Sequence, residues 1–264
     1  MSDMRPNFGR SISLGKSLKA DRPRTRLAQS RHRELLHYTG KMNWRGTTRF
    51  GDGYVEFSGK AGDNSFHTHA AYQLVFATEG VAVELQAGAL ICEPHLYIRP
   101  NIAHRLLATD AATILLIEPH SPLGRHLEEE LPPKEAGPYG ASKDAIDHLT
   151  RRLSPSVLDE RLQAVMKALS GPDALQLSIA DLAGGENLSS ARLRELANEQ
   201  IGMTPGKWRT WTALGRACQL MAEGVTAASA AYEAGFSDQA HLIRTMRKTL
   251  GITPAMTRGA LRAP

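Results

Sequence analysis

The pattern of hydrophobic and polar positions changes twice along the chain. Residues 1–45 show no sustained period. Residues 50–118 contain short alternating or apolar runs, such as AYQLVFA and TILLIE, separated by glycine and proline. This pattern predicts an antiparallel β sandwich or barrel. A proline-rich stretch, 119–141, predicts a boundary, and helical periodicity follows it.

These patterns predict a two-domain α+β protein. The first domain is an antiparallel β barrel, and the second is all-α. Two helices between the domains are expected near 142–152 and 155–169, with Ser154 and Pro155 as the cap and first-turn pair of the second helix. They either pack on the next domain, transmit coupling between the two domains, or form a dimer contact. The predicted parts are a tail (1–45), a β domain (46–141), linker helices (142–172) and a helical domain (173–264).

The last part of the chain has the layout of a helix-turn-helix. A helix of small residues over 226–234 precedes Gly235, which allows a tight turn. Phe236 is expected to fill the core beneath the turn. Ser237 and Asp238 offer oxygens that can cap the following helix. The buried stripe of that second helix repeats every four residues: Leu242, Met246 and Leu250.

An upstream segment, 178–205, repeats this plan. Asn187 stands at the turn, Ser189 caps the second helix, and the segment ends in GMTP where the later copy ends in GITP. A connecting helix over about 206–223 would be roughly 27 Å long. One turn of B-DNA is about 34 Å. A rigid rod of that length would place two reading helices in successive major grooves.

Residues 173–258 resemble the AraC/XylS family of bacterial transcription regulators, most closely in AAYEAGFSDQAHLIRTMRKTLGITP. The resemblance implies double-stranded DNA as partner and two helix-turn-helix units. The side chains implied to contact bases are Ala191, Arg194, Glu195, Gln239, Ala240, Ile243 and Arg244. Those expected to contact phosphates are Ser189, Arg192, Ser237, Arg247 and Lys248.

The β domain contains the segment FHTHAAYQLVFATEG. His67 and His69 share one face of an extended chain, and Gln73 has the same parity. His104 follows later, in RPNIAH. This constellation resembles the motifs of the cupin superfamily, with Gln73 in place of the usual glutamate. The domain also resembles the sensor module of AraC-type regulators, so a cupin-like barrel is expected.

Three interpretations of His67, His69, Gln73 and His104 remain open. They bind a divalent transition metal, line an organic-effector pocket, or form a structural polar cluster. Imidazole ligands would favour Zn²⁺, Ni²⁺ or Fe²⁺. The sequence thus favours a transcription regulator, not an enzyme, that senses a small molecule or metal ion. The alternatives are a metal-dependent cupin enzyme with a helical appendage and a regulator whose sensor binds nothing.

Charge and composition change this picture only in part. Residues 1–49 hold 12 Lys/Arg against 3 Asp/Glu, a balance of +9, so the net charge of +5 for the whole chain comes from this first segment. Such a tail either assists nucleic-acid binding or is a solvated leader. Two distant cysteines and the lack of a long apolar run predict a cytoplasmic protein without a membrane partner. The sequence leaves open a monomer or homodimer, and activator or repressor; an activator would also contact RNA polymerase.

Overall fold

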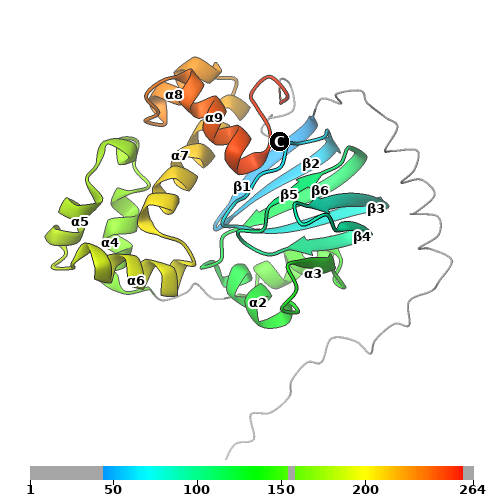
Figure 1. The fold of residues 1–264 in the computed structure, drawn as a ribbon, viewed down its shortest axis with the longest axis horizontal. Helices are drawn as coiled ribbons and strands as arrows, with labels where there is room; N and C mark the ends of the chain where they lie inside the picture. Colours follow the sequence, from blue (N-terminus) through cyan, green and yellow to red (C-terminus); the bar gives the residue numbers. More distant parts are fainter. Residues whose placement is uncertain (1–43, 154–157, 258–264) are drawn as a thin grey trace, which may run out of the picture.

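The computed structural model describes residues 44–153 and 158–257, which form a sheet domain and a helical domain (Figure 1). The predicted tail lies outside the described residues up to residue 43. Trp44 and Arg45, which the sequence pattern assigns to the tail, belong to the sheet domain. Trp44 is buried and Arg45 begins the first strand.

Seven antiparallel strands build the sheet in the described part of the chain. Their order is β1-β2-β6-β3-β4-β7, and β5 pairs with β3. The predicted antiparallel β domain is therefore confirmed. The strands are β1 (Arg45–Gly51), β2 (Tyr54–Ala61), β3 (Tyr72–Leu85), β4 (Leu90–Ile98), β5 (His104–Leu106), β6 (Thr109–Ile117) and β7 (Ala136–Pro138).

Strand β3 organises the domain, because it pairs with three neighbours. The apolar runs on either side of Gly80 form this one strand rather than two. The pairing with β4 shifts register between Phe76 and Val81. Before the shift β3 also pairs with β6, and after it with β5. A bulge bends a strand and increases its twist, which accounts for the change of partner.

The proline-rich segment 119–141 packs on the sheet domain. It contains β7 and helix α2 (Pro122–Glu130). Ser121 caps α2 by accepting a hydrogen bond from the Gly124 amide at 3.0 Å. Leu127 of α2 is fully buried in a cluster with Tyr72 of the sheet. The prolines therefore fit the first turn of a helix and an edge strand.

Of the two helices between the domains, one packs on the sheet domain and the other packs on the helical domain. Helix α3 (Lys143–Thr150) buries Ile146 in the sheet-domain cluster. Helix α4 (Glu160–Ala168) buries Leu162 in the helical-domain cluster. Asp159 caps α4, so that helix begins later than expected, and Ser154 and Pro155 lie outside the described residues.

The helical domain contains both predicted helix-turn-helix units. Helix α7 joins them, and Figure 1 shows α6 and α9 near its opposite ends. In the described part of the chain, no helix has the length and apolar character needed to cross a membrane. The helical elements are η1 (Ala174–Gln176), α5 (Ile179–Gly185), α6 (Ser190–Ile201), α7 (Pro205–Ala222), α8 (Ala227–Glu233) and α9 (Gln239–Leu250).

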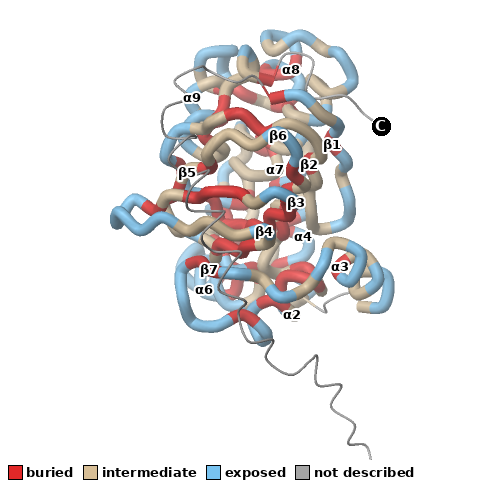
Figure 2. Tube along the Cα trace, turned by 90° about the vertical axis from the view of Figure 1, so that its right-hand side faces the viewer, coloured by how far each residue is buried: buried red, intermediate tan, exposed pale blue. Residues whose placement is uncertain are grey.

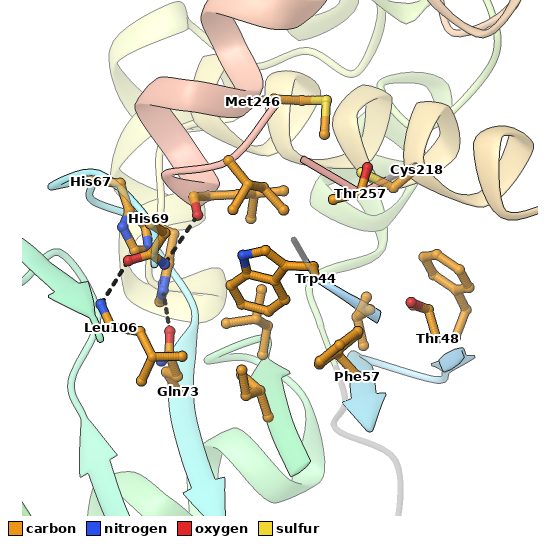
Figure 3. Close-up of a pocket in the computed structure, with 17 residues that line it drawn as sticks. Trp44, Thr48, Phe57, His67, His69, Gln73, Leu106, Cys218, Met246 and Thr257 are labelled. Carbon is orange, nitrogen blue, oxygen red and sulfur yellow. Dashed lines mark hydrogen bonds between the residues drawn. The ribbon is translucent and has the colours of Figure 1, made fainter. Parts of the chain in front are cut away.

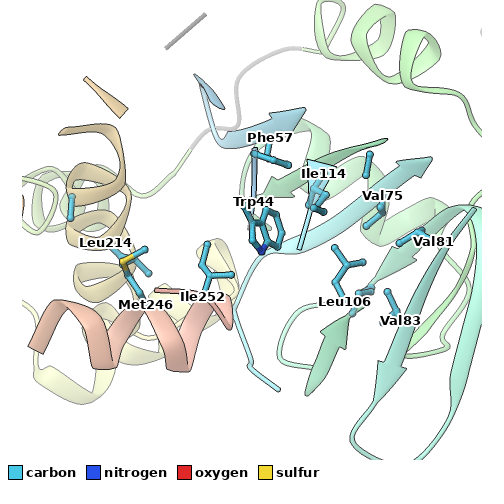
Figure 4. Close-up of a cluster of buried hydrophobic side chains, with 14 of the residues drawn as sticks. Trp44, Phe57, Val75, Val81, Val83, Leu106, Ile114, Leu214, Met246 and Ile252 are labelled. Atoms are coloured by element: carbon cyan, nitrogen blue, oxygen red, sulfur yellow. The ribbon is translucent and has the colours of Figure 1, made fainter. Parts of the chain in front are cut away.

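One hydrophobic core crosses the boundary between the domains. Trp44, Phe57 and Leu106 contribute from the sheet domain, and Leu214 of α7 and Met246 of α9 complete the same cluster (Figure 4). Figure 2 shows buried residues running through β3 and the elements around it. Because the two domains share apolar contacts, a change at this boundary alters the packing of both.

Candidate functional site

The second helix-turn-helix unit follows the sequence prediction closely. Gly235 has φ 85°, which gives the left-handed turn between α8 and α9. Phe236 is buried beneath that turn. The cap of α9 is Asp238, whose carboxylate accepts from the His241 amide at 2.7 Å. Ser237, the alternative cap, instead donates to Asp238 at 3.2 Å, so the aspartate is the main stabiliser of this helix start.

The first helix-turn-helix unit has the same local design. Asn187 has φ 55°, and the Ser189 hydroxyl accepts from the Arg192 amide at 3.1 Å. The inner stripe of α6 is buried at Leu193, Leu196 and Ala197. Helix α7 contains 18 residues, which corresponds to a length of about 27 Å.

The candidate base-contacting side chains lie on the outer surfaces of α6 and α9. Ile243 is half-buried and the other six are exposed. Arg192 forms an ion pair of 2.5 Å with Glu195, so one phosphate candidate and one base candidate are engaged with each other in the free protein. The six exposed base candidates are Ala191, Arg194, Glu195, Gln239, Ala240 and Arg244, and the five phosphate candidates Ser189, Arg192, Ser237, Arg247 and Lys248 are exposed as well.

The structure brings together all four members of the predicted histidine cluster, and each is buried. Gln73 lies on β3 and His104 on β5, whereas His67 and His69 lie just before β3. Backbone hydrogen bonds of 3.0 and 3.1 Å join His67 to His104. The ligand-capable nitrogens of the three histidines all lie within 4.8 Å of one another.

Hydrogen bonds fix the tautomer of each imidazole. In all three histidines Nδ1 lies 2.8–3.0 Å from a backbone carbonyl oxygen, which can only accept, so Nδ1 carries the proton. Burial lowers the pKa of His67 to about 4, and it lowers the pKa of His69 and His104 as well. The rings are therefore neutral at pH 7, with an unprotonated Nε2.

Gln73 stands between two of these nitrogens. Its Oε1 lies 3.1 Å from Nε2 of His69 and 3.2 Å from Nε2 of His104. Three acceptors in such proximity repel one another. Two arrangements remove that repulsion: a cation between them, or a half-turn of the amide that directs its NH₂ group at both rings.

A cavity of about 100 Å³ opens beside this cluster, between the two domains (Figure 3). His67, His69 and Gln73 form one side of it. The sheet domain contributes apolar side chains, and the helical domain contributes Met246 and Leu250 of α9. The recognition helix of the second unit is thus also part of the cavity wall.

The carboxyl end of α9 is fastened to the segment that carries His67. The Gly251 carbonyl accepts from the Ser65 amide at 2.8 Å and from its hydroxyl at 3.1 Å. The Lys248 carbonyl accepts from the Thr68 amide at 3.3 Å. Gly251 has φ 70°, and a Cβ at this position would lie 2.4 Å from the Ser65 oxygen. Only glycine allows so close an approach in this conformation.

A second contact between the domains involves buried ionisable groups. Glu118, which follows β6, accepts from the Trp211 indole of α7 at 3.0 Å. Burial raises the pKa of Glu118 to about 7, against the opposing effect of that hydrogen bond. Burial also lowers the pKa of neighbouring His120 to about 4. The sequence pattern gives no sign of this cluster, because Trp211 is 93 positions from Glu118 along the chain.

Glu84 of β3 is engaged away from the histidine cluster. Glu84 pairs with Arg105 at 2.6 Å. Arg105 is adjacent to His104 in β5, so its side chain points to the opposite face of the ladder. Glu84 therefore does not face the histidine cluster.

Comparisons with known proteins agree with this architecture. The helix-turn-helix domain family matches residues 182–260. ToxT K231A from Vibrio cholerae strain SCE256, in its apo form, superposes with a TM-score of 0.52 at 11% identity, over 78% of this chain and 96% of that one. ToxT from Vibrio cholerae O395 superposes with a TM-score of 0.50 at 11% identity, over 77% and 96%.

A transcriptional regulator with an AraC-type DNA-binding domain from Chromobacterium violaceum is 26% identical, over 38% of this chain and 89% of that one, with a TM-score of 0.35. No curated protein matches the chain. A sheet domain followed by two helix-turn-helix units on one connecting helix defines a DNA-binding regulator. The carboxyl-terminal part of the chain, residues 182–260, is a helix-turn-helix domain of the AraC type.

Proposed function

We propose that this regulator senses a ligand in the cavity between its domains and thereby changes how its two recognition helices engage an operator. The observation that carries the proposal is the double role of α9. Its amino-terminal residues are exposed for DNA, while Met246 and Leu250 line the cavity and Gly251 is fastened to the sheet domain.

Coupling follows from this placement. A ligand in the cavity contacts side chains of both domains, so it binds the docked arrangement of α9 more tightly than an undocked one. By linkage, DNA that prefers one arrangement changes the ligand affinity by the same factor that the ligand changes the DNA affinity. Helix α7 transmits the change, because it holds α6 and α9 at a fixed spacing.

Base recognition is assigned to the exposed turns of α6 and α9. Arg244 is suited to the O6 and N7 atoms of guanine, and Gln239 to N6 and N7 of adenine. Glu195 can accept from cytosine N4 once its ion pair with Arg192 opens. The remaining candidates, Ala191, Arg194, Ala240 and Ile243, provide a further guanidinium and apolar contacts to thymine methyl groups.

Selection of bound duplexes from a random pool, followed by footprinting, tests this function. We expect two protected half-sites one helical turn apart. The same selection without residues 1–43 measures whether the basic tail contributes. The absence of any enriched sequence with the full chain would overturn the proposal.

A specific observation also favours a second candidate, metal sensing. Three neutral imidazoles direct Nε2 towards one another, and each Nδ1 donates to a carbonyl, as is common around protein-bound metals. His67, His69, His104 and Gln73 would hold a Zn²⁺, Ni²⁺ or Fe²⁺ ion, which would offer a positive charge to an effector. Elemental analysis of untagged protein tests this candidate. Less than a tenth of an equivalent of metal would exclude it, and Gln73→Glu should raise the metal content.

A further inference from the structure

The lining of the cavity is almost wholly apolar and carries no formal charge. Among the described residues that line it there is no lysine, arginine, aspartate or glutamate. The apolar side chains come from several elements: Phe50, Val55, Ile114, Leu116, Met246 and Ile252. An anion enclosed here would lose its hydration without gaining a cationic partner, which is strongly unfavourable.

Two polar groups in this lining have no hydrogen-bond partner among the described residues. They are the indole Nε1 of Trp44 and the hydroxyl of Thr48. The Trp44 side chain is 7% exposed and Thr48 is 4% exposed, so solvent does not compensate them. Figure 3 shows Trp44 between the histidines and Phe57. Buried polar groups are nearly always hydrogen-bonded, so two orphans in one cavity indicate an absent partner.

The other polar side chains around the cavity are already engaged. Asn64 accepts from the Leu106 amide at 2.6 Å, and Thr257 donates to the Pro254 carbonyl at 3.2 Å. His67 gives its Nδ1 proton to the Ser65 carbonyl, which leaves Nε2 as an acceptor. The cavity therefore offers a ligand one indole donor, one hydroxyl and one imidazole acceptor.

The geometry points to an uncharged, mainly apolar small molecule with a hydroxyl or carbonyl group as the ligand of this cavity. This inference rests on the proposed function, because it specifies the effector of the same site. The volume of about 100 Å³ limits the ligand size. A cavity of about 150 Å³ accommodates benzene, so the ligand is no larger than one small ring or a short chain.

Phenol, toluene and benzoate are matched probes, because they share one ring and differ only in the substituent. Their binding to the full chain, treated with EDTA, is measured at pH 7 by calorimetry. Phenol should bind about two- to tenfold more tightly than toluene, the range that one net hydrogen bond provides. Benzoate should not bind. Equal affinities for phenol and toluene, tighter binding of benzoate, or no binding of phenol at its solubility limit would each overturn the inference.

Two conservative variants locate the hydrogen bond. Thr48→Val keeps the shape of the lining and removes one orphan group, whereas Trp44→Phe removes the other and also makes the side chain smaller. At least one of them should reduce the preference for phenol over toluene towards unity. A preference that both variants retain would overturn the assignment of these groups. Because Trp44→Phe also alters the core, Thr48→Val provides the comparison that is less dependent on folding.

Parallel measurements of operator affinity separate this inference from the proposed function. If phenol binds with the expected preference but operator affinity is unchanged, the ligand class stands and the coupling fails. If benzoate changes operator affinity and phenol does not, the coupling stands and the ligand class fails. Repeating the titrations with added Zn²⁺ completes the test: benzoate binding that appears only with the metal would overturn the uncharged ligand in favour of a metal-bound anion.

Discussion

Replacement of Gly251 by alanine is expected to release α9 from the sheet domain. Gly251 ends α9 with φ 70°, and its carbonyl accepts two hydrogen bonds from Ser65. An added Cβ would lie 2.4 Å from the Ser65 oxygen and 2.7 Å from Nδ1 of His67. Neither atom can move without disturbing the histidine segment, so the helix end has to withdraw.

Two effects set the size of the change. A left-handed conformation costs an L-residue roughly 1–2 kcal/mol. Loss of the two hydrogen bonds from Ser65 adds about 0.5–1.5 kcal/mol each. The free energy of unfolding should therefore fall by about 2–5 kcal/mol. Gly224 supplies a matched control, because it has φ 95° with nothing within 4 Å of an added Cβ. Gly224→Ala should therefore lose only the stability that the left-handed conformation costs an L-residue.

Urea unfolding measures the stabilities, and a fluorescence titration with a selected operator measures DNA binding. Gly251→Ala should change operator affinity, whereas Gly224→Ala should not. Gly251→Asn adds a further comparison, since asparagine tolerates the left-handed backbone but retains the collision. If the two alanine variants lose equal stability and bind the operator equally, α9 is not held by Ser65 and the coupling mechanism is refuted.

Three further predictions concern single side chains. Arg244→Ala should weaken operator binding by roughly 1–3 kcal/mol and leave binding to random DNA less affected, as competition titrations would show. Arg216→Ala, at an exposed position of α7, should leave the preference for operator over random DNA unchanged. Asp238→Ala should lower the free energy of unfolding by about 0.5–2 kcal/mol in urea, because it removes the cap of α9. Burial raises the pKa of Glu118 from 4.5 to about 7, so the stability that its bound proton provides is complete below pH 4.5 and is lost as the pH rises to 7. Between pH 4.5 and 7, the free energy of unfolding of the wild type should fall by up to about 3 kcal/mol relative to that of Glu118→Gln, as unfolding measured at several pH values would show. Parallel plots of this free energy against pH for the two proteins would contradict the assignment.

The helix-turn-helix units could be predicted from the sequence because their determinants are local. A cap such as Ser189 and a turn residue such as Gly235 act within a few positions of the helix they control. The four members of the histidine cluster were also recognisable, since their spacing belongs to a known motif. The alternative caps Ser237 and Asp238 show the limit of this approach: both fit the pattern, and only the geometry distinguishes them.

Beyond the histidine cluster, the walls of the cavity could not be predicted, because they come from segments that are distant along the chain. Trp44 lies at the edge of a region without periodicity, and its burial depends on contacts with Phe57 and with the helical domain. The contact between Ser65 and Gly251 joins residues 186 positions apart. Such pairs leave no periodic signal in either segment. For the same reason, the proline-rich stretch that packs as α2 and β7 resembled a boundary.

The energies of this domain boundary suit control by a small ligand. Each hydrogen bond between Ser65 and Gly251 contributes about 0.5–1.5 kcal/mol. A ligand that prefers the docked arrangement tenfold shifts the equilibrium by about 1.4 kcal/mol, which is of the same size. Since Met246 and Leu250 line the cavity and also belong to α9, a ligand that fills it gains contacts only while α9 stays docked.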